Sequence, residues 1–228
     1  MSDATLSDAT LAETATADAV DVVVEDHGSH GTTTGISNNK LMMWVFLGSE
    51  CLLFGALIST YLLYKSRFVD RFGVLENGEP NPLGPGEIFD IPFTSMSSFI
   101  LLGSSLTMVL ALSAITRGDY PRFRIWTLTT AALGATFIAG QIYEFTEFAG
   151  YGLGYTTNIF GSAFYTLTGF HGVHVSVGIL MLLAIYVMHK QGRLNQDKAE
   201  TVEIVGLYWH FVDVVWILIF TVVYLFPQ

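Results

Sequence analysis

Charged residues are scarce in this chain. Only 13% of its 228 residues are Asp, Glu, Lys or Arg, and 51% are hydrophobic; a soluble globular domain carries about 25% charged residues. A single cysteine, Cys51, excludes an internal disulfide and any CxxC zinc or haem-attachment motif. The chain also lacks a glycine-rich phosphate loop and a nucleophile elbow, so it offers no nucleotide-binding or hydrolase motif. We expect no nucleic acid among its partners.

The hydrophobic residues gather in five long runs. Each run has the 20 or so residues that a helix needs to cross about 30 Å of hydrocarbon. The runs show neither the polar stripe of a soluble helix nor the alternation of barrel strands. We therefore predict an all-α fold, a polytopic membrane protein with a bundle of five transmembrane helices. The predicted transmembrane domain covers 40–228, with helices at about 41–64, 96–116, 125–148, 159–188 and 204–226.

Basic residues are absent from the first 39 positions. That segment holds seven acidic residues and is rich in Ala and Thr, a composition typical of disorder. It has neither the basic start nor the apolar core of a signal peptide. We predict a disordered acidic cytoplasmic tail over 1–39.

The distribution of Lys and Arg predicts the orientation. Basic residues concentrate in short cytoplasmic loops. With the amino terminus inside, seven of the ten basic residues lie in the cytoplasm and three lie outside. We expect a multi-pass membrane protein with a cytoplasmic amino terminus and an external carboxyl terminus. The seven are Lys40, Arg117, Arg122, Arg124, Lys190, Arg193 and Lys198.

Five ionisable residues lie at membrane depth. Such groups are costly in lipid, so they usually face the protein interior or a cavity. Glu50 and Asp213 each lie about nine residues into a helix that runs outward, and His210 precedes Asp213 by three positions. His171 and His174 lie near the middle of the fourth run. These positions predict one buried polar cluster.

Three roles fit such a cluster. Its residue types could ligate a metal, as in di-metal helical bundles, but the Glu-x-x-His repeats of those bundles are absent from the spans. It could form a proton path. It could also be a hydrogen-bonded brace between helices, which is the role we favour. We assign no catalytic and no metal-binding residue.

Other candidate residues support packing. Gln141 and Glu144 lie near the outer end of the third run, where Glu144 either faces water or braces a neighbouring loop. A stripe of small residues along the fourth run predicts close helix approach, with that helix at the centre of the bundle. The stripe consists of Ser162, Gly169, Gly172 and Ser176.

Three segments resemble one known family. YWHFVDVVWI at 208–217, GSAFYTLTGFHGVHV at 161–175 and GSECLLFG at 48–55 are similar to motifs of subunit III of the haem–copper cytochrome c and quinol oxidases. GQIYEF at 140–145 is a weaker match, and the resemblance covers about 41–226. Five helices fit the short bacterial or archaeal form, so the resemblance implies the plasma membrane of a prokaryote.

The resemblance implies a non-catalytic accessory subunit of a respiratory terminal oxidase that reduces oxygen to water. It implies haem and copper in partner subunits and none in this chain. Subunit I would be its direct catalytic partner, with subunit II and smaller subunits in the same complex. It also implies bound phospholipid, longer working life of subunit I, and support for proton uptake.

Two other classes of function remain open from the residues alone. A free-standing transporter or channel would explain buried charges, but transporters commonly show inverted repeats and broken helices. We find no internal repeat, and none of the five runs contains proline. A metal-dependent membrane enzyme would use the His, Glu and Asp residues as ligands.

Overall fold

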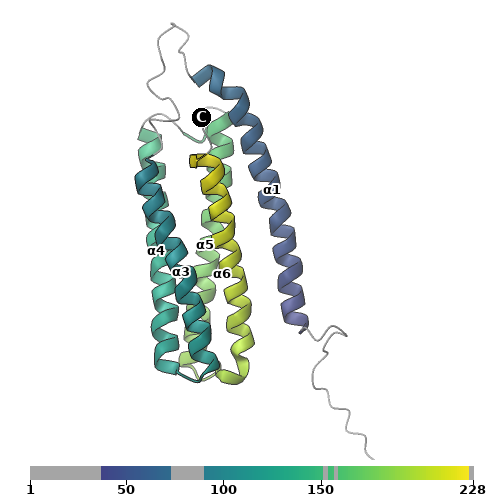
Figure 1. Cartoon of the computed structure of the whole chain (residues 1–228), viewed down its shortest axis with the longest axis vertical. Helices are drawn as coiled ribbons and strands as arrows, with labels where there is room; N and C mark the ends of the chain where they lie inside the picture. Colours follow the sequence, from purple (N-terminus) through teal and green to yellow (C-terminus); the bar gives the residue numbers. More distant parts are fainter. Residues whose placement is uncertain (1–36, 73–89, 151–153, 157–158, 226–228) are drawn as a thin grey trace, which may run out of the picture. The chain divides into compact units, whose positions relative to one another are not determined.

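The structure, a computed structural model, describes residues 37–72, 90–150, 154–156 and 159–225, without the side chains of 66–72. These ranges contain five helices long and apolar enough to cross a membrane, which confirms the predicted all-α membrane fold (Figure 1). Most of the predicted tail lies outside the described residues. The helices are α1 (Asn38–Phe72), α3 (Ile91–Thr116), α4 (Tyr120–Gly150), α5 (Ile159–Lys190) and α6 (Ala199–Phe220). A short 3₁₀ helix, η1 (Gln196–Lys198), precedes α6, and a π-helical turn, η2 (Thr221–Leu225), follows it.

Local sequence signals set several helix ends. Asp90 caps α3 by accepting a hydrogen bond from the backbone N–H of Phe93, and Pro92 occupies the first turn, where its missing N–H costs nothing. Gly118 ends α3 with a φ of 71°, a left-handed conformation that glycine adopts without strain. Asp119 then caps α4 through the N–H of Arg122. The three-residue link makes α3 and α4 antiparallel neighbours.

Helices α3, α4, α5 and α6 form the closely packed part of the fold, in which α3 and α5 each pack along both α4 and α6. Helix α6 is the most enclosed, because half (50%) of its most apolar stretch is buried, against 33% in α5. The indole of Trp209 lies between α4 and α5, where Gly134 and Gly178 leave room for its ring. Its Nε1–H donates to Ser104 Oγ on α3 at 3.0 Å. One side chain of α6 therefore touches all three neighbouring helices.

Helix α1 lies at the side of this group (Figure 1), and only 11% of its most apolar stretch is buried. Its buried hydrophobic residues recur every seven positions, at Leu47, Phe54 and Tyr61. A seven-residue repeat keeps one seam of a helix against its neighbour. Along this seam Phe46 stacks on Tyr208 at a centroid distance of 6.4 Å.

Ion and hydrogen-bond contacts fix the direction of α1 relative to α6. Lys40 Nζ lies 2.8 Å from Glu203 Oε2 near the start of both helices. Lys65 Nζ donates to the carbonyl of Val222 at 3.3 Å, beyond the end of α6. The two helices therefore run parallel.

Candidate functional site: intramembrane polar residues

Glu50 and His174 form a direct pair between α1 and α5. His174 Nε2 lies 3.1 Å from Glu50 Oε2, and both side chains are about 85% buried. Phe54, one turn further along α1, meets the edge of the His174 ring at 5.0 Å. The pair is thus enclosed by the same seam that packs α1 against α5 and α6.

The hydrogen bonds of His174 indicate which of its ring nitrogens carries a hydrogen. Its Nδ1 lies 2.7 Å from the carbonyl oxygen of Phe170, which can only accept, so Nδ1 carries a hydrogen. A hydrogen bond from Nε2 to Glu50 then needs one further proton, either on the imidazole or on the carboxyl group. A proton shared between Nε2 and the carboxyl group would then join the two side chains.

His171 lies three residues earlier on α5 but in different surroundings. It is fully buried, and neither ring nitrogen has a hydrogen-bond partner among the described residues. Its ring stacks on Trp216 at 4.8 Å and meets the edge of Phe137 at 5.8 Å. His171 is packed as an aromatic ring between α4 and α6.

His210 and Asp213 lie together on α6 and face α3. Ser105 Oγ lies 2.6 Å from His210 Nδ1. Asp213 is 3% exposed, and both of its carboxyl oxygens are without a hydrogen-bond partner in the described part of the chain. Ser105 also lies beside Asp213, but its hydrogen bond in the structure is the one to His210.

The five residues therefore divide into three settings and do not form a single hydrogen-bonded network within the described ranges. Glu50 and His174 link α1 to α5, and His210 links α6 to Ser105 on α3. His171 packs against aromatic rings of α4 and α6. Across the described residues, no three His, Cys, Asp or Glu side chains converge in a way that could hold a metal ion.

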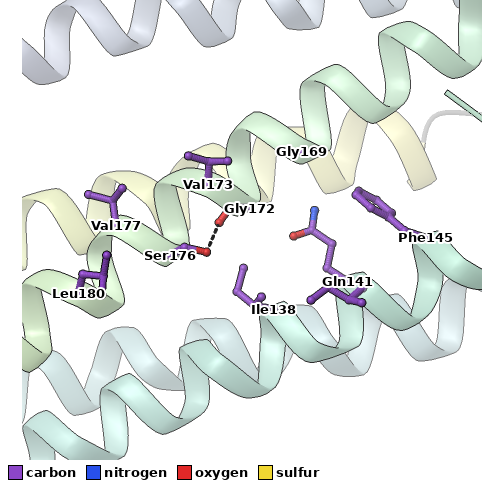
Figure 2. Close-up of a pocket in the computed structure, with 10 residues that line it drawn as sticks. Ile138, Gln141, Phe145, Gly169, Gly172, Val173, Ser176, Val177 and Leu180 are labelled. Carbon is purple, nitrogen blue, oxygen red and sulfur yellow. Dashed lines mark hydrogen bonds between the residues drawn. The ribbon is translucent and has the colours of Figure 1, made fainter. Parts of the chain in front are cut away.

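Gln141 and Glu144 brace α4 against two different helices. Gln141 Nε2 donates to the carbonyl of Thr168 on α5 at 2.8 Å, and Figure 2 shows its amide reaching across from α4. Glu144 is 4% exposed and accepts a hydrogen bond from Thr94 Oγ1 on α3. Glu144 thus contacts a neighbouring helix, where the sequence suggested water or a loop.

The small-residue stripe on α5 has several local partners. At Gly172 a Cβ would come within 2.6 Å of Gln141 Oε1, so glycine there permits the contact between α4 and α5. Ser176 Oγ donates to the carbonyl of Gly172 at 2.9 Å. Ser162 Oγ donates to the carbonyl of Tyr155 at 2.6 Å. At Gly169 an added Cβ would meet nothing within 4 Å.

Sequence reasoning missed the buried indole contacts. Trp209 and Trp216 donate to Ser104 and Ser98, at 3.0 and 2.8 Å. The signal was present as two tryptophans seven residues apart on one helix and two serines six residues apart on an antiparallel helix. The contact of Thr94 with Glu144 was also missed.

Comparison with known proteins places these features in a family. The family model for cytochrome c oxidase subunit III matches residues 5–228. A cytochrome c oxidase subunit 3 of Bacillus sp. (strain PS3) is 42% identical over 188 residues, which cover 82% of this chain and 86% of the relative. A quinol oxidase subunit 3 of Bacillus subtilis (strain 168) is 36% identical over 208 residues, covering 88% and 97%. A cytochrome c oxidase subunit 3 of Thermostichus vulcanus is 39% identical over 189 residues, covering 82% and 87%. The chain belongs to the cytochrome c oxidase subunit III family.

Proposed function

We propose that this chain is the non-catalytic accessory subunit III of a respiratory haem–copper terminal oxidase. The family match over residues 5–228 carries the proposal. The relatives named above are subunits of cytochrome c oxidases or of a quinol oxidase, so the chain would work inside a multisubunit complex. The oxygen chemistry would take place on haem and copper held by partner subunits.

The use of the buried polar side chains supports a structural role. Glu50 binds His174, Gln141 binds the Thr168 carbonyl, and Glu144 accepts from Thr94. Each contact joins two different helices, and a hydrogen bond in lipid stabilises such a contact because the unpaired alternative is costly. These residues hold the helices together and would present a fixed surface to a partner.

In the proposed complex the direct partner is the catalytic subunit I, with subunit II and smaller subunits beside it. Phospholipid would bind between the chains, and the complex would stay active for more turnovers. The distribution of basic residues supports a cytoplasmic amino terminus. Support for proton uptake is part of the same proposal.

The test is purification of the chain from native membranes through an affinity tag. We expect haem-bearing chains in the eluate, a haem absorption spectrum, and oxygen consumption with a suitable electron donor. Metal analysis of the chain after it is separated from its partners should find no bound metal in stoichiometric amount. A chain that purifies alone, with transport activity or its own metal, would contradict the proposal.

A further inference from the structure

A groove of about 300 Å³ runs between α4 and α5. Its floor includes Gln141 and Gly172, and along α5 it extends from Gly169 to Leu180. That length is about 16 Å, or three helical turns, at 1.5 Å per residue. Figure 2 shows Gln141 at its base, with Val173, Val177 and Leu180 following α5 beside it.

Gln141 is 95% buried (5% exposed), and its hydrogen bond to Thr168 uses one of the two N–H groups of its amide. Its Nε2 donates to the Thr168 carbonyl, and because that carbonyl can only accept, the contact fixes which end of the amide is the oxygen. Oε1 then points towards Gly172, at 2.6 Å from where a Cβ would lie. No described residue donates an N–H or O–H to it, and a glycine Cα–H is a weak donor.

Gln141 Oε1 needs a hydrogen-bond donor, and this limits which molecules the groove can bind. A lipid acyl chain has no hydrogen-bond donor, so it would leave an acceptor unpaired in a medium without water, which is unfavourable. A transmembrane helix can bring a hydroxyl or amide side chain to the same depth. The unpaired oxygen therefore favours a helix over lipid.

Gly169 is the second feature of the groove that favours a helix as its occupant. A Cβ at this position would meet nothing within 4 Å, so no contact inside the chain requires a glycine there. Glycine within a helix costs about 1 kcal/mol relative to alanine. On a membrane helix, small residues at the surface let another helix backbone approach closely. Gly103 on α3 has the same open space, but only Gly169 lines the groove beside Gln141.

We propose that the α4–α5 groove is a docking site for one transmembrane helix of another chain in the same oxidase complex. That helix packs its backbone at Gly169 and places a Ser, Thr, Asn or Gln side chain within hydrogen-bond distance of Gln141 Oε1. The inference rests on the proposed function only in taking the partner from that complex.

The first test is Gly169→Leu, made in the whole complex in native membranes. The Cβ of the new side chain meets nothing within 4 Å in the chain itself, and leucine favours helix, but the rest of the side chain would extend into the groove. We expect the amount of this chain retained with the haem-bearing chains to fall about tenfold, which corresponds to about 1.4 kcal/mol of docking energy. The matched control is Gly103→Leu on α3, where an added Cβ also meets nothing within 4 Å, and it should be retained as well as the unmodified chain.

The second test places a benzophenone amino acid at Val173, which is 61% exposed beside the groove. Illumination of native membranes should join this chain to one other membrane-spanning chain of the complex, and Gly169→Leu should abolish that product. The control is the same probe at Ile125 on α4, which is also 61% exposed but lies outside the groove.

Products with lipid only, products with a second copy of this chain, or a product pattern equal to that of the control would overturn the docking site. Full retention of Gly169→Leu would overturn it as well. Those results would leave the accessory role standing, because the unmodified chain would still purify with the haem-bearing chains. Failure of that purification would instead contradict the proposed function.

Discussion

Trp209 determines which side chains α4 and α5 can carry at its level. Its ring occupies the space that a side chain at Gly134 or Gly178 would need, since a Cβ at either position would lie less than 3 Å from a ring atom. The ring is also held by the hydrogen bond from Nε1 to Ser104. A rigid, bonded ring cannot move aside as a flexible side chain could, so both glycines are required by packing.

Gly178→Ala should therefore destabilise the chain. The new Cβ would meet the ring at 2.8 Å, and overpacking of this kind costs about 1–3 kcal/mol. Gly103→Ala is the matched control, because its Cβ meets nothing within 4 Å and alanine favours helix. Thermal unfolding in detergent should show a lower midpoint for Gly178→Ala and an unchanged or higher midpoint for Gly103→Ala. Equal midpoints would show that Trp209 is not fixed as described.

Substitutions of Glu50 separate a brace from a proton path. In Glu50→Gln the amide can donate to the Nε2 of a neutral His174, so we expect little loss of stability. Glu50→Leu leaves the histidine nitrogen unpaired, at a cost of about 1–3 kcal/mol. The measurement is retention of this chain in the complex after heating. If Gln and Leu lower retention equally, the charge itself is needed, and the brace is the wrong explanation.

The depth of the polar residues could be predicted from the sequence, but their pairing could not. Residue number and helical rise place Glu50 and His174 at comparable depth, and the structure pairs them. His171 and His174 are separated by about 60° around α5, so small helix rotations decide which of them faces α1. Helical periodicity alone does not predict that rotation, because it depends on how Trp209 and Trp216 pack against α3, α4 and α5.

Helix α1 depends on a narrow seam, whereas the other helices share a broader core. Met43, Glu50, Leu57 and Tyr64, each three or four positions from one of the buried hydrophobic residues of this helix, are partly buried, so contacts alternate at spacings of three and four. This pattern is typical of left-handed helix packing. One polar residue, Glu50, interrupts an otherwise apolar seam and fixes its register on α5.

Phe54→Ala should weaken the docking of α1. Phe54 is 2% exposed and contacts the rings of His174 and Phe211. We expect a loss of about 2 kcal/mol, below the 3–5 kcal/mol of water-soluble cores because the lost contacts are replaced by lipid. Leu52→Ala, at a site that is 78% exposed, is the control and should be neutral. The midpoint of thermal unfolding in detergent measures both, and a larger effect at Leu52 would contradict this seam.

The existence of the five helices followed from composition, because runs of 20 apolar residues have few alternatives in a membrane. The small residues along α5 predict a packing surface, and Gly172 does permit the approach of Gln141. The opening beside Gly169 could not be foreseen, because it depends on how far α4 and α5 lie apart along their length.

The direction of the chain across the membrane sets which loops meet the cytoplasm. We propose that the turn after α3 lies inside and that the link before α5 lies outside. Arg117 and Tyr155 are exposed residues of these two segments. In a Cys51→Ser background, Arg117→Cys should react with an impermeant maleimide only in inside-out vesicles. Tyr155→Cys should react only in right-side-out cells, and the reverse pattern would invert the topology.

Removal of this chain from an otherwise intact oxidase shows whether it acts as an accessory subunit. Oxygen-electrode traces with and without the chain give both the initial rate and its decay, and spectra report haem and copper. We predict unchanged spectra, an initial rate that survives in large part, and fewer turnovers before irreversible inactivation, because in the proposed complex subunit I would lose neighbouring helices and lipid. Immediate loss of haem, or of all initial activity with subunit I intact, would contradict the accessory role.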